Sequence, residues 1–212
     1  MKRLLVRWAG LSLLALMSFS AFAQTTDDDM LRRRAAEKCA QFNNYVSLIG
    51  RKIDKKGRSV PLQTRMYYRD AALKLFIANG NEYTEYVGTE ERNIAGVMMQ
   101  TTSVNRPNQK PKSTLMKTYL YNLANLKYTN VVISSTDVAN IKVSSLRKID
   151  ENTYVCTCYF TQTFIGYRDG IPVYKDRTSK YVKCYVYPES TEDGMEYIIR
   201  LGDVFATDTE RL

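Results

Sequence analysis

The spacing of the hydrophobic residues changes from mostly helical to mostly strand-like along this 212-residue chain, and that change restricts the fold more than any other feature. Between residues 30 and 49, apolar side chains recur at three- and four-residue steps, the period of one face of a helix. The same period returns at 62–77 and 115–126. From Tyr128 onward, β-branched and aromatic residues predict strands. Helices followed by strands predict an α+β fold, with the N-terminal helices packed on a curved, mostly antiparallel, cone-like sheet.

Cap and turn residues predict where these elements begin and end. Gly50 follows the first helix, where a left-handed C-terminal cap belongs. Ser59 is expected to cap the second helix, with Pro61 in its first turn, and Ser113 to cap the third. The last three strands are expected at Tyr154–Ile165, Tyr181–Tyr187 and Met195–Phe205, separated by a loop at 166–178 and a turn at 188–194.

The alternation within these strands predicts which face is buried. Even-numbered residues of 154–165 and 182–186 are mostly Cys, Val and Phe, whereas odd-numbered ones are mostly Thr, Tyr and Lys. Side chains of successive strand residues point to opposite faces. We therefore expect the Cys/Val/Phe face to lie under the helices and the Thr/Tyr/Lys face to meet water.

The first 23 residues have the three parts of a secretory signal. Lys2, Arg3 and Arg7 form a basic start, an apolar run follows at 11–21, and Ala21-Phe22-Ala23 is a small-x-small cleavage site. The expected organisation is a signal peptide at 1–23, a flexible segment at 24–29, one α+β domain at 30–206 and a frayed tail at 207–212. The protein is then periplasmic or secreted. No later segment is apolar enough to predict an integral membrane span.

Charge and composition exclude several functions. The chain has 31 basic and 22 acidic residues, but cleavage after Ala23 would remove three basic groups and no acid, leaving a charge of +6 (28 minus 22). Export and this modest excess argue against a nucleic-acid partner. The chain has no His, which excludes Ser-His-Asp and Cys-His catalysis. No phosphate-binding or nucleophile-elbow motif occurs, so no cofactor and no catalytic residue is predicted.

The four cysteines allow two interpretations. Export favours one or two disulfides among Cys39, Cys156, Cys158 and Cys184, whereas the alternative is that they are small buried hydrophobic residues that stay reduced. If a bridge forms, we expect Cys184 to pair with Cys156 or Cys158, or Cys39 to pair with the sheet. A four-cysteine zinc site would need the helix of Cys39 to lie over that face, and the paired CxxC spacing typical of zinc sites is absent.

The sixteen tyrosines are the most unusual feature of the composition. Several of them share the predicted outward face of the sheet with a lysine, and a basic hairpin tip lies beyond: Tyr159, Tyr181, Tyr185, Tyr187, Lys183 and Arg168. Tyrosine is enriched where proteins dock, although it is also simply a good strand former. We expect this face or the hairpin tip to bind a protein or glycan, with a homodimer as the simplest case.

The order of these elements resembles the nuclear transport factor 2-like, or cystatin-like, cone fold. The resemblance covers about residues 60–206. It is carried by the segments Gln162–Gly170 and Asp176–Val182, and by Tyr119–Leu123 before the following strand, which look like small exported Bacteroidetes-type bacterial proteins. The resemblance implies either a binding or assembly module or an enzyme that works in the cone's cavity, since the fold does not decide function.

These observations predict an exported, non-catalytic binding or assembly module that uses its sheet face or hairpin tip. The alternative is a small-ligand carrier or an enzyme with an apolar cavity between the helices and the concave sheet. That alternative requires a sizeable pocket that holds an inward-facing Asp, Arg or Tyr with a perturbed pKa.

Overall fold

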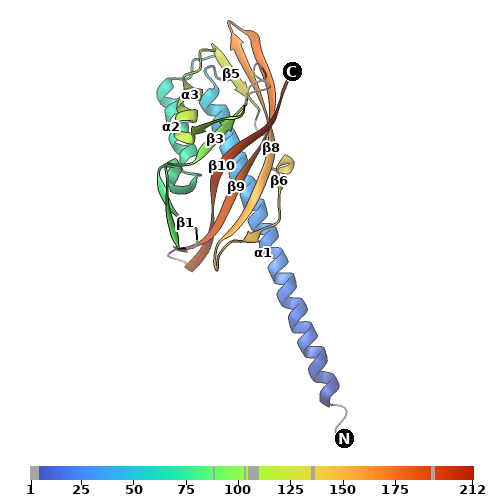
Figure 1. Cartoon of the computed structure of the whole chain (residues 1–212). Coiled ribbons are helices and arrows are strands. Elements are labelled where there is room, and N and C mark those ends of the chain that lie inside the picture. The colour runs from blue at the N-terminus through green and yellow to red at the C-terminus, as the bar shows by residue number, and fades with distance from the viewer. Residues whose placement is uncertain (1–4, 88, 103, 105–109, 135–136, 192–193) are drawn as a thin grey trace.

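The computed structural model of the chain describes residues 5–87, 89–102, 104, 110–134, 137–191 and 194–212. Three α-helices lie against one face of a large open sheet (Figure 1). The helices are α1 (Leu5–Gly50), α2 (Leu62–Leu73) and α3 (Met116–Ala124), with short 3-10 turns at Ile77–Gly80 and Val138–Asn140. This confirms the predicted α+β class.

The large sheet has the strand order β4-β3-β10-β9-β8-β5, and β6 and β7 pair with β8 beyond this path. Its strands are β3 (Met98–Thr101), β4 (Lys112–Leu115), β5 (Asn130–Ile133), β6 (Lys142–Val143), β7 (Arg147–Lys148), β8 (Tyr154–Arg168), β9 (Ile171–Thr191) and β10 (Gly194–Arg211). The pairing is antiparallel except between β3 and β10. A separate hairpin joins β1 (Tyr83–Val87) to β2 (Glu90–Ile94).

The buried core lies between α1 and the predicted inner face of the sheet. On β8 and β9, the even-numbered residues Cys156, Cys158, Val182, Cys184 and Val186 are buried, as the alternation predicted. They meet the apolar stripe of α1, whose fully buried residues are Ala35, Cys39, Phe42, Val46 and Ile49. Register shifts at Gly166/Tyr167 in β8 and after Leu201 in β10 interrupt the ladders, and such bulges bend a sheet.

The first helix is much longer than expected. Residues 5–23 of the predicted signal, together with the segment 24–29, form the beginning of α1, which projects beyond the sheet (Figure 1). Residues 1–4 lie outside the described part of the chain, and cleavage after Ala23 stays a prediction. Among the described helices, none is both long and apolar enough to cross a bilayer.

The predicted helix caps were wrong. Gly50 does not adopt a left-handed conformation. A Cβ at this position would lie 3.1 Å from Val131 and 3.2 Å from Ile133, so the glycine allows α1 to approach β5 closely. Neither α2 nor α3 has a side-chain cap, since Ser59 pairs with Ile53 in an isolated bridge and Ser113 lies within β4.

The predicted loop at 166–178 was also wrong, because β8 and β9 are joined by a tight turn. Asp169 and Gly170 have φ values of 52° and 83°, and positive φ at both central residues is typical of the type I′ hairpin turn. The strands therefore continue on both sides of these two residues. At the other end of β10, residues 209–211 pair with β9, so most of the segment expected to fray belongs to the sheet.

Candidate functional site

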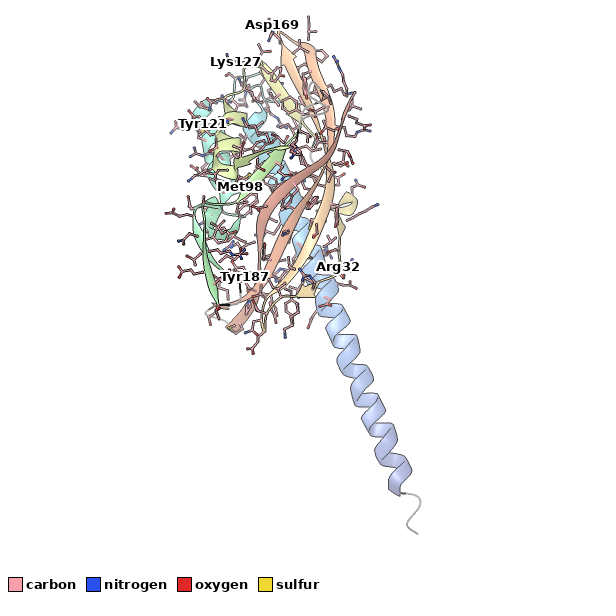
Figure 2. The ribbon with its side chains drawn as sticks, in the orientation of Figure 1. Arg32, Met98, Tyr121, Lys127, Asp169 and Tyr187 are labelled. Carbon is pink, nitrogen blue, oxygen red and sulfur yellow. The ribbon has the colours of Figure 1, made fainter. Side chains whose placement is uncertain are left out.

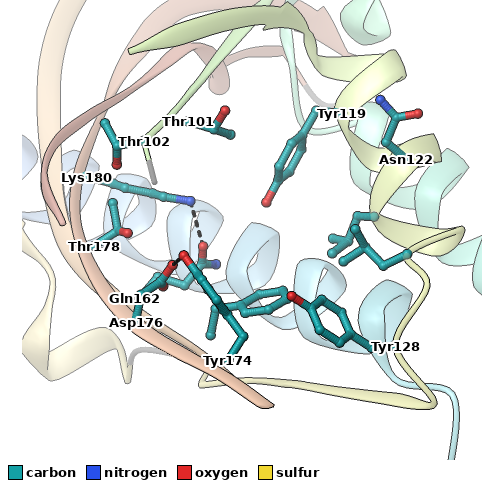
Figure 3. A pocket seen from close by; sticks show the side chains of 13 residues that line it. Thr101, Thr102, Tyr119, Asn122, Tyr128, Gln162, Tyr174, Asp176, Thr178 and Lys180 are labelled. Atoms are coloured by element: carbon teal, nitrogen blue, oxygen red, sulfur yellow. Dashed lines mark hydrogen bonds between the residues drawn. The ribbon is translucent and has the colours of Figure 1, made fainter. Parts of the chain in front are cut away.

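A cavity of about 290 Å³ lies between α3 and the hairpin end of the inner sheet face (Figure 3). We call it the Lys180 cavity. Its lining comes from the end of β3, from α3 and the segment after it, and from β8 and β9: Thr101, Thr102, Tyr119, Asn122, Leu123, Leu126, Tyr128, Gln162, Phe164, Tyr174, Asp176, Thr178 and Lys180. One side of this lining is apolar and the other carries hydrogen-bonding and charged groups, as in many small-molecule sites.

The polar side of the cavity arises from a change in composition along β9. The inner-face residues Val182, Cys184 and Val186 pack in the core, whereas Lys180 and Asp176, on the same face, are polar and almost fully buried. The side-chain period of a strand is two, so the residues of both groups point to the same side. A single strand face thus supplies both the core and the cavity.

Lys180 places a buried amine in this cavity. Its side chain is 7% exposed, and Nζ donates a hydrogen bond of 2.6 Å to Gln162 Oε1 on β8. Figure 3 shows the amine and the Tyr119 hydroxyl both pointing into the cavity, and Nζ lies 6.0 Å from the centre of the Tyr119 ring. Burial lowers the pKa of Lys180 to about 8, although the charge of Asp176 opposes this. A much larger fraction of the amine is therefore neutral near pH 8 than for an ordinary lysine.

Asp176 is the acidic group of the same cavity. It is 8% exposed, and Tyr174 Oη donates a 2.6 Å hydrogen bond to its Oδ2. Burial raises the pKa of Asp176, whereas the Tyr174 hydrogen bond and the charge of Lys180 oppose that shift. Burial, with a contribution from Asp176, also raises the pKa of Tyr119. Among the ion pairs of the described residues, none joins Lys180 to Asp176 directly, so neither group is neutralised by contact with the other.

The cavity combines a few polar side chains with apolar ones, and its possible chemistry comes from the polar groups. It offers an amine with an accessible neutral form, a carboxyl group that can hold a proton, and a phenol. Within the described ranges, no group of three or more Cys, Asp or Glu side chains could hold a metal ion.

Sequence reasoning missed these residues because it placed Asp176 in a turn and began the strand at Tyr181. Asp169-Gly170 is a strong sequence signal for a two-residue hairpin. Extending both strands to that turn would have put Asp176 and Lys180 on the inner face beside Gln162. Gln162 was assigned to that face, and its buried position is confirmed.

The structure separates the tyrosines that the sequence grouped together. Tyr159 on β8, Tyr181 on β9 and Phe205 on β10 form a row across the outer face, which we call the aromatic row. The ring centres of Tyr159 and Tyr181 are 6.1 Å apart, and Tyr181 stacks on Phe205 at 4.7 Å with an angle of 13° between the ring planes. Tyr159 is 48% exposed, so the outward orientation of this part of the face is confirmed.

Tyr185 belongs to a different environment. Its ring lies over Gly202, where an added Cβ would approach Tyr185 Cε2 to 2.7 Å. Burial, then the charges of Glu85 and Asp203, raise the pKa of Tyr185. Burial and Asp203 likewise raise the pKa of Tyr83 in β1 to about 12. The β1–β2 hairpin therefore partly covers the outer face at Tyr185, which is less exposed than Tyr159.

The remaining predicted contact residues do not converge. Lys183 is exposed on β9, and Tyr187 is partly buried opposite Ile198. Figure 2 shows Asp169, at the hairpin tip, and Tyr187 at opposite ends of the sheet. Arg168 is adjacent to Asp169 and lies nine positions along β8 from Tyr159, a distance of about 30 Å at the usual rise per residue. The hairpin tip and the aromatic row are thus separate surfaces, and docking at either one stays a prediction.

The four cysteines lie together in the core as free thiols. Cys158 Sγ and Cys184 Sγ are 3.4 Å apart, well beyond the S–S bond length of about 2.05 Å. Cys39 on α1 contacts the same group, and its hydrogen bond to Cys158, followed by burial, raises the pKa of the Cys39 thiol. The expected disulfide is therefore not formed, and the cysteines are the reduced, buried residues of the alternative interpretation.

Comparisons with known proteins give no functional information. No known protein family and no curated protein matches the chain. The solved structure of the Kfla4162 protein from Kribbella flavida is similar over 54% of this chain and 71% of its own length, with 14% sequence identity and a TM-score of 0.28. A likeness this weak carries no argument about fold or function.

Proposed function

We propose that this protein binds a small organic molecule in the Lys180 cavity. The observation that carries the proposal is the amine of Lys180, which is buried at the wall of a cavity with one hydrogen-bond partner, Gln162, among the described residues. Burying a charged group is costly unless its hydrogen bonds are satisfied. A ligand with a hydrogen-bond acceptor near Nζ would supply a partner in addition to Gln162, the one that the described residues provide.

The cavity limits the size of the ligand. A water molecule occupies about 30 Å³ in the liquid, so a volume of about 290 Å³ holds roughly ten atoms other than hydrogen. Leu123, Leu126 and Phe164 are apolar members of the lining, and Phe164 lies directly across from Asp176 in the β8–β9 pairing. The ligand is therefore a compact molecule with an apolar body and a polar group at one side. This proposal is the small-ligand alternative of the sequence analysis, and it is independent of the predicted export and family resemblance.

Filling the cavity tests this function. Indole is a neutral probe of suitable size, and the face of its ring can accept the N–H of Lys180 Nζ, as in a cation–π pair. We expect it to bind saturably, raising the melting temperature and shifting the amide NMR signals of Asn122 and Leu123. The Leu126→Trp variant puts a large side chain into the cavity and should lose this binding by at least about tenfold, because the ligand and the new ring compete for the same volume. The matched control is Leu62→Trp, since Leu62 is 45% exposed on α2 and does not line the cavity.

Circular dichroism should show that both variants keep the wild-type secondary structure. If Leu126→Trp binds indole with wild-type affinity, indole does not bind in the Lys180 cavity. If neither indole nor benzyl alcohol binds saturably to the wild-type protein, the proposed function is contradicted.

A further inference from the structure

The Lys180 amine has the surroundings of a nucleophile as well as those of a hydrogen-bond donor. We propose that Lys180 forms a reversible imine with a small aldehyde or ketone bound in the Lys180 cavity. The proposal rests on the proposed function, because the carbonyl compound must first occupy the cavity. It adds a reaction and a substrate class, namely uncharged carbonyl compounds of roughly ten or fewer atoms other than hydrogen, for a cavity of this volume.

The first support is the position of Nζ. It reaches the cavity from the inner face of β9, and among the described residues Gln162 Oε1 is its one hydrogen-bond partner. A direct ion pair would favour the protonated amine, whose nitrogen has no free lone pair. No described carboxylate forms such a pair with Lys180. The neutral amine can therefore turn its lone pair toward a carbonyl carbon in the cavity (Figure 3).

The second support is desolvation. Lysines become nucleophilic in proteins when an apolar pocket or a nearby cation favours their neutral form. Lys180 is 7% exposed, and Leu123, Leu126 and Phe164 line the same cavity. The pKa of about 8 has the same cause, burial of the amine.

The reaction balances without an oxidant or a cofactor. The ammonium group of Lys180 first loses one proton. The neutral Nζ then attacks the carbonyl carbon; nitrogen gives up one proton and the carbonyl oxygen takes up one, which gives a neutral carbinolamine. A second proton on that oxygen lets the C–O bond break and the oxygen leave as water while the C=N bond forms, and the protonated imine can then release its remaining N–H proton. Hydrolysis by one water molecule reverses the sequence.

Asp176 and Tyr119 are the groups that can move these protons. Asp176 lines the cavity from the same strand face as Lys180, and the Tyr119 hydroxyl points toward it from α3 (Figure 3). Tyr174 donates a hydrogen bond to Oδ2 of Asp176, and among the described residues none donates to Oδ1, the oxygen to which we assign the proton transfer. We assign Asp176 the role of proton donor to the carbonyl oxygen and proton acceptor from nitrogen.

Reductive trapping with benzaldehyde and cyanoborohydride tests the proposal in the full-length protein. Reduction converts an imine into a stable secondary amine, so peptide mapping by mass spectrometry identifies the lysine. We expect one benzyl adduct, on Lys180, whose rate of formation saturates with benzaldehyde concentration.

Lys180→Arg keeps the positive charge but should lower the yield of cavity adduct by more than about tenfold, since guanidinium is not a nucleophile at neutral pH. Asp176→Asn should slow trapping by about tenfold or more, because a general acid–base group usually contributes at least that factor to a reaction rate.

The matched control is Lys183→Arg. Lys183 lies three residues away on the same strand but is exposed on the outer face, so this variant should be trapped at the wild-type rate. Mapping of the wild-type adduct locates the reaction even if a Lys180 variant does not fold.

Benzyl alcohol separates failure of this inference from failure of the proposed function. It has the shape of benzaldehyde but cannot form an imine. If benzyl alcohol binds the cavity and benzaldehyde gives no adduct on Lys180, the imine is excluded and the binding function stands. If the adducts are spread over the exposed lysines without saturation, the imine proposal is also overturned. If neither compound nor indole binds, both proposals fail.

Discussion

Gly166 lies where the sheet meets the wall of the Lys180 cavity. It is buried in β8, and a Cβ built on it would come within 2.6 Å to 2.8 Å of three ring atoms of Tyr128. Tyr128 lines the cavity and packs edge-on against Phe164, with ring centres 5.8 Å apart. The glycine thus makes room for an aromatic ring and does not serve a turn.

We predict that Gly166→Ala destabilises the protein by about 1–3 kcal/mol, because the ring of Tyr128 must move out of a packed position. Chemical denaturation of the variant measures this effect. Shortening the ring side chain should relieve the clash, so Tyr128→Leu combined with Gly166→Ala is expected to lose less stability than the sum of the two single changes. Strict additivity of the two substitutions would show that Gly166 is needed for some reason other than Tyr128.

At the scale of the element, α3 depends on cations from outside itself. This nine-residue helix has no side-chain cap and no basic residue in its last turn. Arg65 Nη1 on α2 donates to the carbonyl oxygen of Ala124, and Lys52 Nζ donates to that of Leu126. The last carbonyl groups of a helix lack partners within it and carry partial negative charge. The two cations therefore stabilise the end of α3 that forms the apolar wall of the cavity.

We predict that Arg65→Met lowers the free energy of unfolding by about 1–3 kcal/mol, since it leaves a buried carbonyl group without its charged donor. Arg58→Met is the control, because Arg58 pairs with Asp54 at the surface, where its side chain is 72% exposed, and such pairs contribute about 0–1 kcal/mol. Comparing the urea-unfolding midpoints of the two variants with that of the wild-type protein measures the two losses of stability. Equal losses in the two variants would mean that Arg65 does not stabilise α3 through its carbonyl groups.

At the scale of the whole molecule, the cysteines report how α1 packs on the sheet. Cys39 on α1 and the three cysteines of β8 and β9 are each at most 2% exposed. A reagent can reach them only when the helix separates from the sheet or the protein unfolds. Hydrogen bonds to Cys156 and Cys158, followed by burial, raise the pKa of Cys184, which further lowers the thiolate fraction available for reaction.

We predict that a thiol reagent modifies none of the four cysteines rapidly in the native protein and all four after denaturation without a reductant. Mass spectrometry of the alkylated protein counts the modified residues. Fewer than four after denaturation would reveal a disulfide. Rapid modification of the native protein would mean that α1 does not stay packed on the sheet.

The aromatic and β-branched residues after Tyr128 and the helical spacing before them were enough to predict the fold class and the buried faces. Local periodicity depends only on which side of an element faces the core, so it can be read from a single chain. The same reasoning failed for the caps and for the ends of β8 and β9. Position 50 holds a glycine because β5 passes close to it, and the two segments are about eighty residues apart in the sequence.

The alternation along the chain thus predicted that Gln162 faces inward, but it could not show what lies opposite. The Lys180 cavity lies between α3 and the part of β8 and β9 that continues to the Asp169-Gly170 turn. The grouping of Lys180, Asp176 and Tyr119 comes from two elements far apart in sequence. Burial and neighbouring charges, which shift their pKa values, are properties of that packing and not of the residues taken one at a time.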